Sequence, residues 1–217
     1  MRGKEVISVE KIKHIAGIYS YNIRTLPKGI LIFSILYAIL IIFALNVSQT
    51  LNFTPICLGE YLLTPLGVLL FTHLAGFEKE SKVYELTYIR KVPHCMIVIS
   101  RVISYMIGMY LIILMVFSVE KIFGGEFNFF NCVHGSFITA LYLGVIGMVS
   151  AYISGQRTVG YIIPFVYYMF DMFTFGKYTR GLYLFSMIND DFGIKINLLT
   201  ISIVMLILFI VYLYKKL

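Results

Sequence analysis

This chain of 217 residues has few charged residues and few cysteines. Charged residues make up 13% of it, while 59% of its residues are hydrophobic. No soluble core needs so large an apolar fraction, so the composition predicts a protein that is solvated largely by lipid. The three cysteines, Cys57, Cys95 and Cys132, are scattered and have neither the spacing of a metal site nor that of a redox pair.

The sequence also lacks the motifs of catalysis. It has no G-x-x-x-x-G-K-[ST] phosphate loop for nucleotide hydrolysis and no H-E-x-x-H zinc motif. Glu60, His73 and Asp171 are the ionisable residues that come closest to the middle of an apolar stretch, and all three lie near stretch ends. Catalysis inside a membrane usually needs several such groups at mid-span. We therefore expect no enzyme activity, no metal site and no cofactor bound by this chain.

Six apolar stretches are present, and a helix needs about 20 apolar residues to cross a membrane. They cover residues 30–47, 57–77, 96–119, 131–155, 159–175 and 196–214. The fifth is the weakest, because it contains Pro164 and Asp171. The predicted fold class is an all-α integral membrane protein, with residues 1–217 forming a single transmembrane domain of six helices.

The distribution of basic residues predicts the orientation. If both termini are cytoplasmic, 14 of the 18 Lys and Arg residues lie in cytoplasmic segments. The outer segments then hold the other four, which are Lys121, Lys177, Arg180 and Lys195. This bias is typical of membrane proteins with both ends inside. The net charge of +7 then faces anionic headgroups of the lipid bilayer, and no nucleic acid is needed to explain it. We expect a multi-pass protein of the cell membrane, and the Lys- and Ile-rich composition suggests a bacterial one.

Residues 1–28, before the first stretch, are predicted to form an amphipathic helix. Apolar residues recur every three or four positions from Val9 to Ile23, with Lys11 and Lys13 on the opposite face. Such a helix lies in the membrane surface with its lysines toward the headgroups. It either anchors the chain or braces the cytoplasmic end of the helix bundle beside a partner, and the sequence leaves both open.

Small residues recur at intervals of three or four along the fourth stretch. They are Ala140, Gly144, Gly147, Ala151 and Gly155. A stripe of this kind lets two helix backbones approach closely within a membrane. The neighbouring helix could belong to the same bundle or to another subunit.

Between the second and third stretches the chain is polar, and residues 78–95 form a predicted short cytoplasmic helix that ends at Pro93. From Glu78 to Arg101 the sequence has an acidic start, a leucine-containing helix, a proline-led turn and then Ser100-Arg101. In this order it resembles an ABC-2 type transporter permease. The residues that carry the resemblance are Glu78, Glu80, Tyr84, Leu86, Ile89 and Pro93. The match departs from the family pattern after the proline, where this chain has His94-Cys95-Met96. The predicted topology extends the resemblance over essentially the whole chain.

The resemblance implies a membrane subunit without catalytic activity of its own. Such a permease works with a second permease subunit, identical or a sister, and with separate ABC ATPase subunits that bind ATP and Mg²⁺. Residues 78–95 would be the coupling helix that contacts the ATPase, and a solvated loop is the plainer alternative. The cargo would be a lipophilic or amphipathic molecule such as a peptide, a drug or a lipid-linked compound.

The fifth stretch offers residues for a transport pathway, namely Phe165, Tyr168 and Asp171. Asp171 could meet a cationic cargo, but we expect it to pair with Lys177 or Arg180 just beyond the stretch. Residues 176–197 look partly helical and could cap the pathway on the outer side.

Two other classes of protein share the predicted helices. An ATP-independent carrier would be expected to show intramembrane polar residues in two related halves, and we find no convincing internal repeat. A non-transporting immunity or sensor protein is the other.

Overall fold

The computed structural model describes residues 28–48, 55–80, 94–123, 127–189 and 191–215. The described residues are helical and contain no strand. The long helices are α2 (Lys28–Ser48), α3 (Pro55–Glu80), α5 (His94–Ile122), α6 (Phe129–Ser154), α7 (Arg157–Thr174) and α8 (Phe192–Lys215). Two short 3₁₀ helices, η2 (Arg180–Leu182) and η3 (Ser186–Asn189), lie between α7 and α8.

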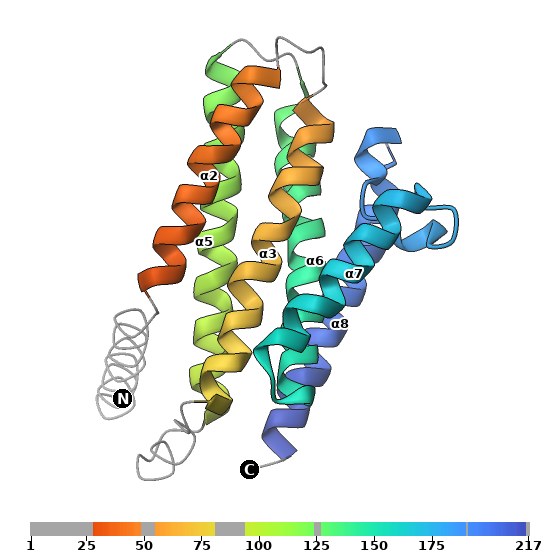
Figure 1. The fold of residues 1–217 in the computed structure, drawn as a ribbon. Coiled ribbons are helices and arrows are strands. Elements are labelled where there is room, and N and C mark those ends of the chain that lie inside the picture. Colours follow the sequence, from red (N-terminus) through yellow and green to blue (C-terminus); the bar gives the residue numbers. More distant parts are fainter. Residues whose placement is uncertain (1–27, 49–54, 81–93, 124–126, 190, 216–217) are drawn as a thin grey trace, which may run out of the picture.

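The long helices run alternately up and down in one bundle (Figure 1). We call the end where α2 begins and α8 ends the basal end. The opposite end, which carries the chain between α7 and α8, is the apical end. The polar stretch between α3 and α5 is connected to the bundle at the basal end, because α3 ends there and α5 begins there.

Within the described residues, three helices are long and apolar enough to cross a membrane. They are residues 97–122 of α5, α6 and α8, and α2 adds a shorter apolar segment at residues 32–43. Large apolar side chains also cover the outside of the bundle, as on α2, where Leu40 and Phe43 are 63% and 72% exposed. A soluble monomer rarely exposes so large an apolar surface, so these features indicate a membrane protein. The six-span topology stays a prediction.

Each long helix begins two residues before the corresponding predicted stretch, except α8, which begins four residues earlier. The earlier start of α8 corrects the predicted position of Lys195. This residue lies in the first turns of α8, where it is buried, and not in an outer segment. The predicted helix over residues 1–28 lies outside the described residues apart from Lys28, the first residue of α2.

Helix α6 lies at the centre of the bundle, packed against α3, α5, α7 and α8. Its small residues allow very close approach. A Cβ added at Gly144 would lie 2.8 Å from the Gly67 carbonyl oxygen, and one at Gly147 would lie 2.9 Å from the carbonyl oxygen of Gly160. Added at Gly160, a Cβ would lie 2.5 Å from that of Ala151. The stripe therefore packs against α3 and α7 of the same chain.

Gly155 has a different role, because it ends α6. Its backbone adopts the left-handed conformation, with φ of 74°, and its N–H donates to the Ala151 carbonyl at 2.9 Å. Glycine reaches this conformation without a steric penalty, which is why it commonly terminates helices.

Two prolines lie inside helices, and the partner helix compensates for each. Pro65 in α3 has no N–H to donate to the Tyr61 carbonyl one turn earlier, and the Tyr168 hydroxyl of α7 donates to that carbonyl at 2.9 Å. Conversely, Pro164 in α7 cannot donate to the Gly160 carbonyl, which accepts from the Thr72 hydroxyl of α3 at 3.1 Å. Helices in lipid tolerate proline when neighbours satisfy the freed carbonyls in this way. The two prolines thus join α3 to α7.

Candidate functional site

The chain between α7 and α8 turns back into the bundle at the apical end. Phe175 and Gly176 both adopt the left-handed conformation, with φ of 48° and 71°, and together they reverse the chain after α7. The chain stays largely exposed as far as Gly181 and then becomes buried again. Residues 183–187 are 0 to 6% exposed, and we call them the inserted segment.

An aromatic cluster surrounds Phe185 in the inserted segment. Its ring centroid lies 4.4 Å from that of Tyr61 on α3, 5.4 Å from that of Tyr168 on α7 and 5.8 Å from that of Tyr183. Centroid distances of about 4.5–7 Å with tilted or edge-to-face rings are favourable for aromatic pairs. Phe185 is fully buried, so this cluster holds the inserted segment by its side chain.

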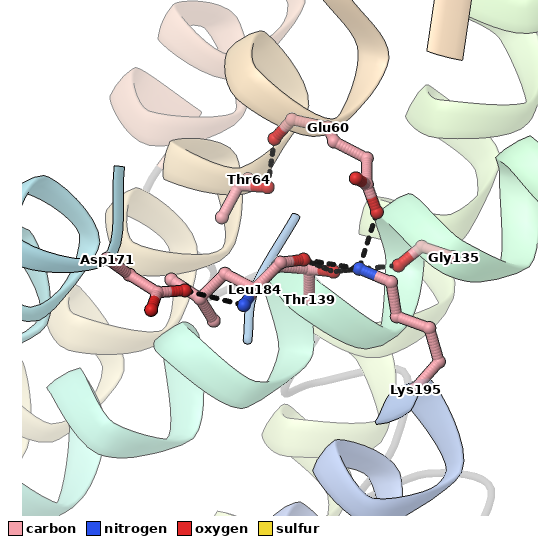
Figure 2. A network of polar contacts seen from close by, with 7 residues as sticks. All are labelled: Glu60, Thr64, Gly135, Thr139, Asp171, Leu184 and Lys195. Carbon is pink, nitrogen blue, oxygen red and sulfur yellow. Dashed lines mark hydrogen bonds and ion pairs between the residues drawn. The ribbon is translucent and has the colours of Figure 1, made fainter. Parts of the chain in front are cut away.

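A buried ion pair lies beneath the inserted segment. The Lys195 ammonium of α8 is 2.5 Å from a carboxylate oxygen of Glu60 on α3, and the two side chains are 0% and 2% exposed. Lys195 also donates to the Thr139 hydroxyl of α6 at 2.6 Å and to the Leu184 carbonyl (Figure 2). Three acceptors match the three ammonium protons of a lysine. The Thr139 hydroxyl in turn donates to the Gly135 carbonyl at 2.9 Å.

Asp171 binds the other polar group of the same residue. The Leu184 N–H donates to an Asp171 carboxylate oxygen at 2.6 Å, and the Thr179 hydroxyl donates to the other oxygen. Figure 2 shows the Leu184 main chain between Asp171 on one side and Lys195 on the other. Leu184 therefore has both its N–H and its C=O held by charged side chains from two different helices.

The position of Asp171 corrects the expectation that it would pair with Lys177 or Arg180. Asp171 is fully buried, whereas both cations are exposed, and its carboxylate accepts hydrogen bonds from Thr179 and Leu184. An exposed ion pair contributes little, while a buried carboxylate that lacks hydrogen bonds is costly. The inserted segment supplies those bonds, so the carboxylate turns inward.

The three predicted pathway residues do not share one surface. Tyr168 and Asp171 are buried, but Phe165 is 46% exposed, although its ring centroid is 5.9 Å from that of Tyr168. Sequence reasoning did not assign a role to Glu60 or Lys195. The available signal was that each is a lone charged residue at the edge of an apolar stretch, a pattern that often marks function in membranes.

The other residues singled out in the sequence belong to the end of α3 and to the stretch that follows it. Glu78 and Glu80 fall in the last turn of α3, which continues three residues past the predicted end of that stretch. Tyr84, Leu86, Ile89 and Pro93 lie outside the described residues. Nearby, an Arg157 guanidinium nitrogen of α7 lies 3.3 Å from a ring nitrogen of His73 on α3.

At the apical end the charged side chains contact one another and the Leu184 main chain. In the described part of the chain, no group of three or more His, Cys, Asp or Glu residues is placed to hold a metal ion. The charged side chains instead hold main-chain groups. In comparisons with known proteins, no protein-family model, curated protein or solved structure matches the chain.

Proposed function

We propose that the chain is the transmembrane permease subunit of an ABC transporter, which couples ATP hydrolysis by a separate ATPase subunit to export of a lipophilic or amphipathic substrate. The observation that carries the proposal is the placement of the polar stretch between α3 and α5. It joins the bundle at the same end as the start of α2 and the end of α8. With the predicted orientation this end is cytoplasmic, where an ATPase would be met.

The packing of α3 supports the mechanical part of the proposal. A force applied where α3 ends would pass along a helix whose backbone touches that of α6, since a Cβ added at Gly67 would lie 1.8 Å from the Ala140 carbonyl oxygen. Thr72 and Tyr168 tie α3 to α7 as well. Closely packed helices move as rigid bodies, so α3, α6 and α7 would respond together.

The test is co-purification of ATPase activity. An affinity-tagged chain is purified from the membranes of its native host, and ATP hydrolysis is measured in the eluate. Leu86→Glu combined with Ile89→Glu should remove the hydrolysis while the chain still inserts. Lys177→Glu combined with Tyr178→Glu changes charge at the exposed apical surface and is the matched control, which should retain it. Hydrolysis that persists with L86E/I89E, or that is absent with the unaltered chain, contradicts the proposal.

The buried ion pair favours a second candidate, an ATP-independent carrier. Ionisable residues inside membrane proteins often serve ion pathways, and Glu60, Asp171 and Lys195 are all buried. Vesicles reconstituted with the chain alone, without ATPase or nucleotide, distinguish the two. Substrate uptake driven by an ion gradient would support the carrier and exclude the ATPase-driven subunit.

A further inference from the structure

The inserted segment is held in the way that proteins hold a bound peptide. Asp171 accepts the N–H of Leu184, and Lys195 donates to its C=O. Two residues earlier, the Tyr167 hydroxyl donates to the Leu182 carbonyl at 3.0 Å. The side chains that bind this stretch of main chain come from α6, α7 and α8, because the Thr139 hydroxyl also lies 3.3 Å from the Leu184 carbonyl oxygen. Local backbone hydrogen bonds, such as that from the Ile188 N–H to the Phe185 carbonyl at 3.3 Å, add to them.

The side chains of the segment are recognised separately from its main chain. Leu184 is fully buried, and Phe185 sits among the rings of Tyr61, Tyr168 and Tyr183. Main-chain hydrogen bonds combined with enclosed side chains are the usual basis of affinity and specificity for extended peptides. The arrangement is therefore selective for an aliphatic residue followed by an aromatic one.

The connection between α7 and the segment is the part most able to release it. Phe175 and Tyr178 are 75% and 71% exposed, and Lys177, Arg180 and Gly181 are exposed as well. Segments with few buried contacts open most easily, and they do so without unfolding the rest of the protein. Withdrawal of the segment would break no long helix.

We infer that the residues around the inserted segment form a binding site for a hydrophobic peptide, and that the chain's own Tyr183-Leu184-Phe185 occupies it in this structure. The ligand is a short peptide whose main chain follows the turn at Leu184 and Phe185, and whose N–H and C=O replace those of Leu184. Its following aromatic side chain takes the place of Phe185. The inference rests on the proposed function insofar as it identifies the exported cargo as a peptide.

The two charged residues are the reason to favour a peptide over a lipid chain or an apolar drug. When the inserted segment leaves, Asp171 loses an N–H donor and Lys195 loses a carbonyl acceptor. Buried charged groups that lose hydrogen bonds are costly, so a ligand that replaces both bonds is favoured. A peptide unit offers both groups at the required spacing, whereas an acyl chain offers neither.

The test uses the peptide N-acetyl-Tyr-Leu-Trp-amide and the full chain in lipid nanodiscs. The chain contains no tryptophan, so all tryptophan fluorescence comes from the probe. Phe185→Ala weakens the binding of the chain's own segment in the site without changing Asp171 or Lys195. We expect a saturable blue shift of the probe emission with F185A. The apparent affinity of the unaltered chain for the probe should be at least about tenfold weaker than that of F185A, because its own segment competes.

Two controls separate site binding from partition into lipid. A probe with N-methyl-leucine is more apolar but cannot donate to Asp171, and it should show no saturable shift. F185A combined with Asp171→Leu should likewise lose binding. Equal binding of both probes, or equal affinity of F185A and the unaltered chain, overturns the inference.

A second way of freeing the segment covers the case in which F185A does not fold. A protease cleavage sequence inserted after the exposed Tyr178 leaves every buried residue native, and cutting it should raise probe affinity in the same way. No increase after complete cutting of a monodisperse protein also overturns the inference. Neither assay contains an ATPase or nucleotide, so their failure is distinct from a failure of the coupling proposal.

Discussion

Lys195 shows at the scale of one residue how a charge is accommodated inside this bundle. Its ammonium group has Glu60, Thr139 and Leu184 as acceptors, and all four residues are buried. These three acceptors offset the desolvation of the ammonium group, although a buried ion pair adds little net stability over an apolar pair of the same shape. The pair thus fixes the geometry of the apical end more than it stabilises the fold.

Removing one partner of this pair should be far more harmful than removing both. Lys195→Met or Glu60→Leu alone leaves a buried group without its partner and should cost roughly 3–5 kcal/mol of unfolding free energy. Glu60→Leu combined with Lys195→Met should recover much of that loss. Thermal unfolding of the purified variants in detergent measures the difference.

The control for this experiment is Lys177→Met, which removes an exposed lysine from the same end of the bundle. It should leave the unfolding temperature nearly unchanged. If the losses from the Glu60 and Lys195 substitutions simply add in the double variant, the two side chains are not energetically coupled and the ion pair is not as described.

At the scale of helices, the contact between α3 and α6 depends on having no side chain at Gly67. A Cβ there would lie 1.8 Å from the Ala140 carbonyl oxygen, whereas one at Gly108 on α5 meets nothing within 4 Å. Gly67→Ala should therefore force the helices apart and cost more than the roughly 1–3 kcal/mol typical of overpacking. Gly108→Ala is the matched control and should be neutral or slightly stabilising, because alanine favours helix.

The yield of monodisperse protein and its thermal unfolding measure both glycine variants. Equal behaviour of Gly67→Ala and Gly108→Ala would show that α3 and α6 do not make this close contact. The comparison is informative because both substitutions add one methyl group within a long helix.

The proline in α7 allows a test of the bond that joins it to α3. Thr72→Val leaves the buried Gly160 carbonyl without the hydroxyl of Thr72, and should cost about 1–3 kcal/mol. Adding Pro164→Ala restores an N–H one turn after Gly160, so T72V/P164A should lose less than T72V. Denaturation in detergent checks this.

Thr200→Val serves as the control for Thr72→Val. Its hydroxyl donates to the Ile196 carbonyl within α8 and is exposed, so little stability should be lost. A T72V variant as stable as T200V would contradict a structural role for the bond between α3 and α7.

At the scale of the whole molecule, the up-and-down order places the start of α2 and the end of α8 at one end and the inserted segment at the other. In a cell this predicts opposite accessibility. A cysteine at Tyr178, 71% exposed at the apical end, should react with an impermeant maleimide in intact cells. One at Tyr214, 74% exposed near the basal end, should react after permeabilisation.

This labelling is done in a background without Cys57, Cys95 and Cys132, so that the new cysteines report alone. The opposite pattern would invert the orientation predicted from the basic residues and place the polar stretch outside. Labelling of both positions in intact cells would contradict the single membrane crossing, by α8, that is expected between them.

The sequence by itself determined the apolar stretches, their approximate bounds and the close-packing stripe on the fourth. These follow from patterns of neighbouring residues, since helix length, hydropathy and small-residue spacing are local properties. Gly144, Gly147 and Ala151 could be named for this reason, even though the sequence left open whether they contact the same chain or another.

The tertiary structure alone decided which residues meet at the apical end. Glu60, Thr139, Asp171 and Lys195 come from four helices, and no spacing along the chain brings them together. It also decided that Asp171 binds the Leu184 main chain, because the sequence shows the nearby cations but not that residues 183–187 turn back into the bundle. The physical reason is that a charged side chain buried inside the bundle can bind only the groups that the packing of the helices brings next to it.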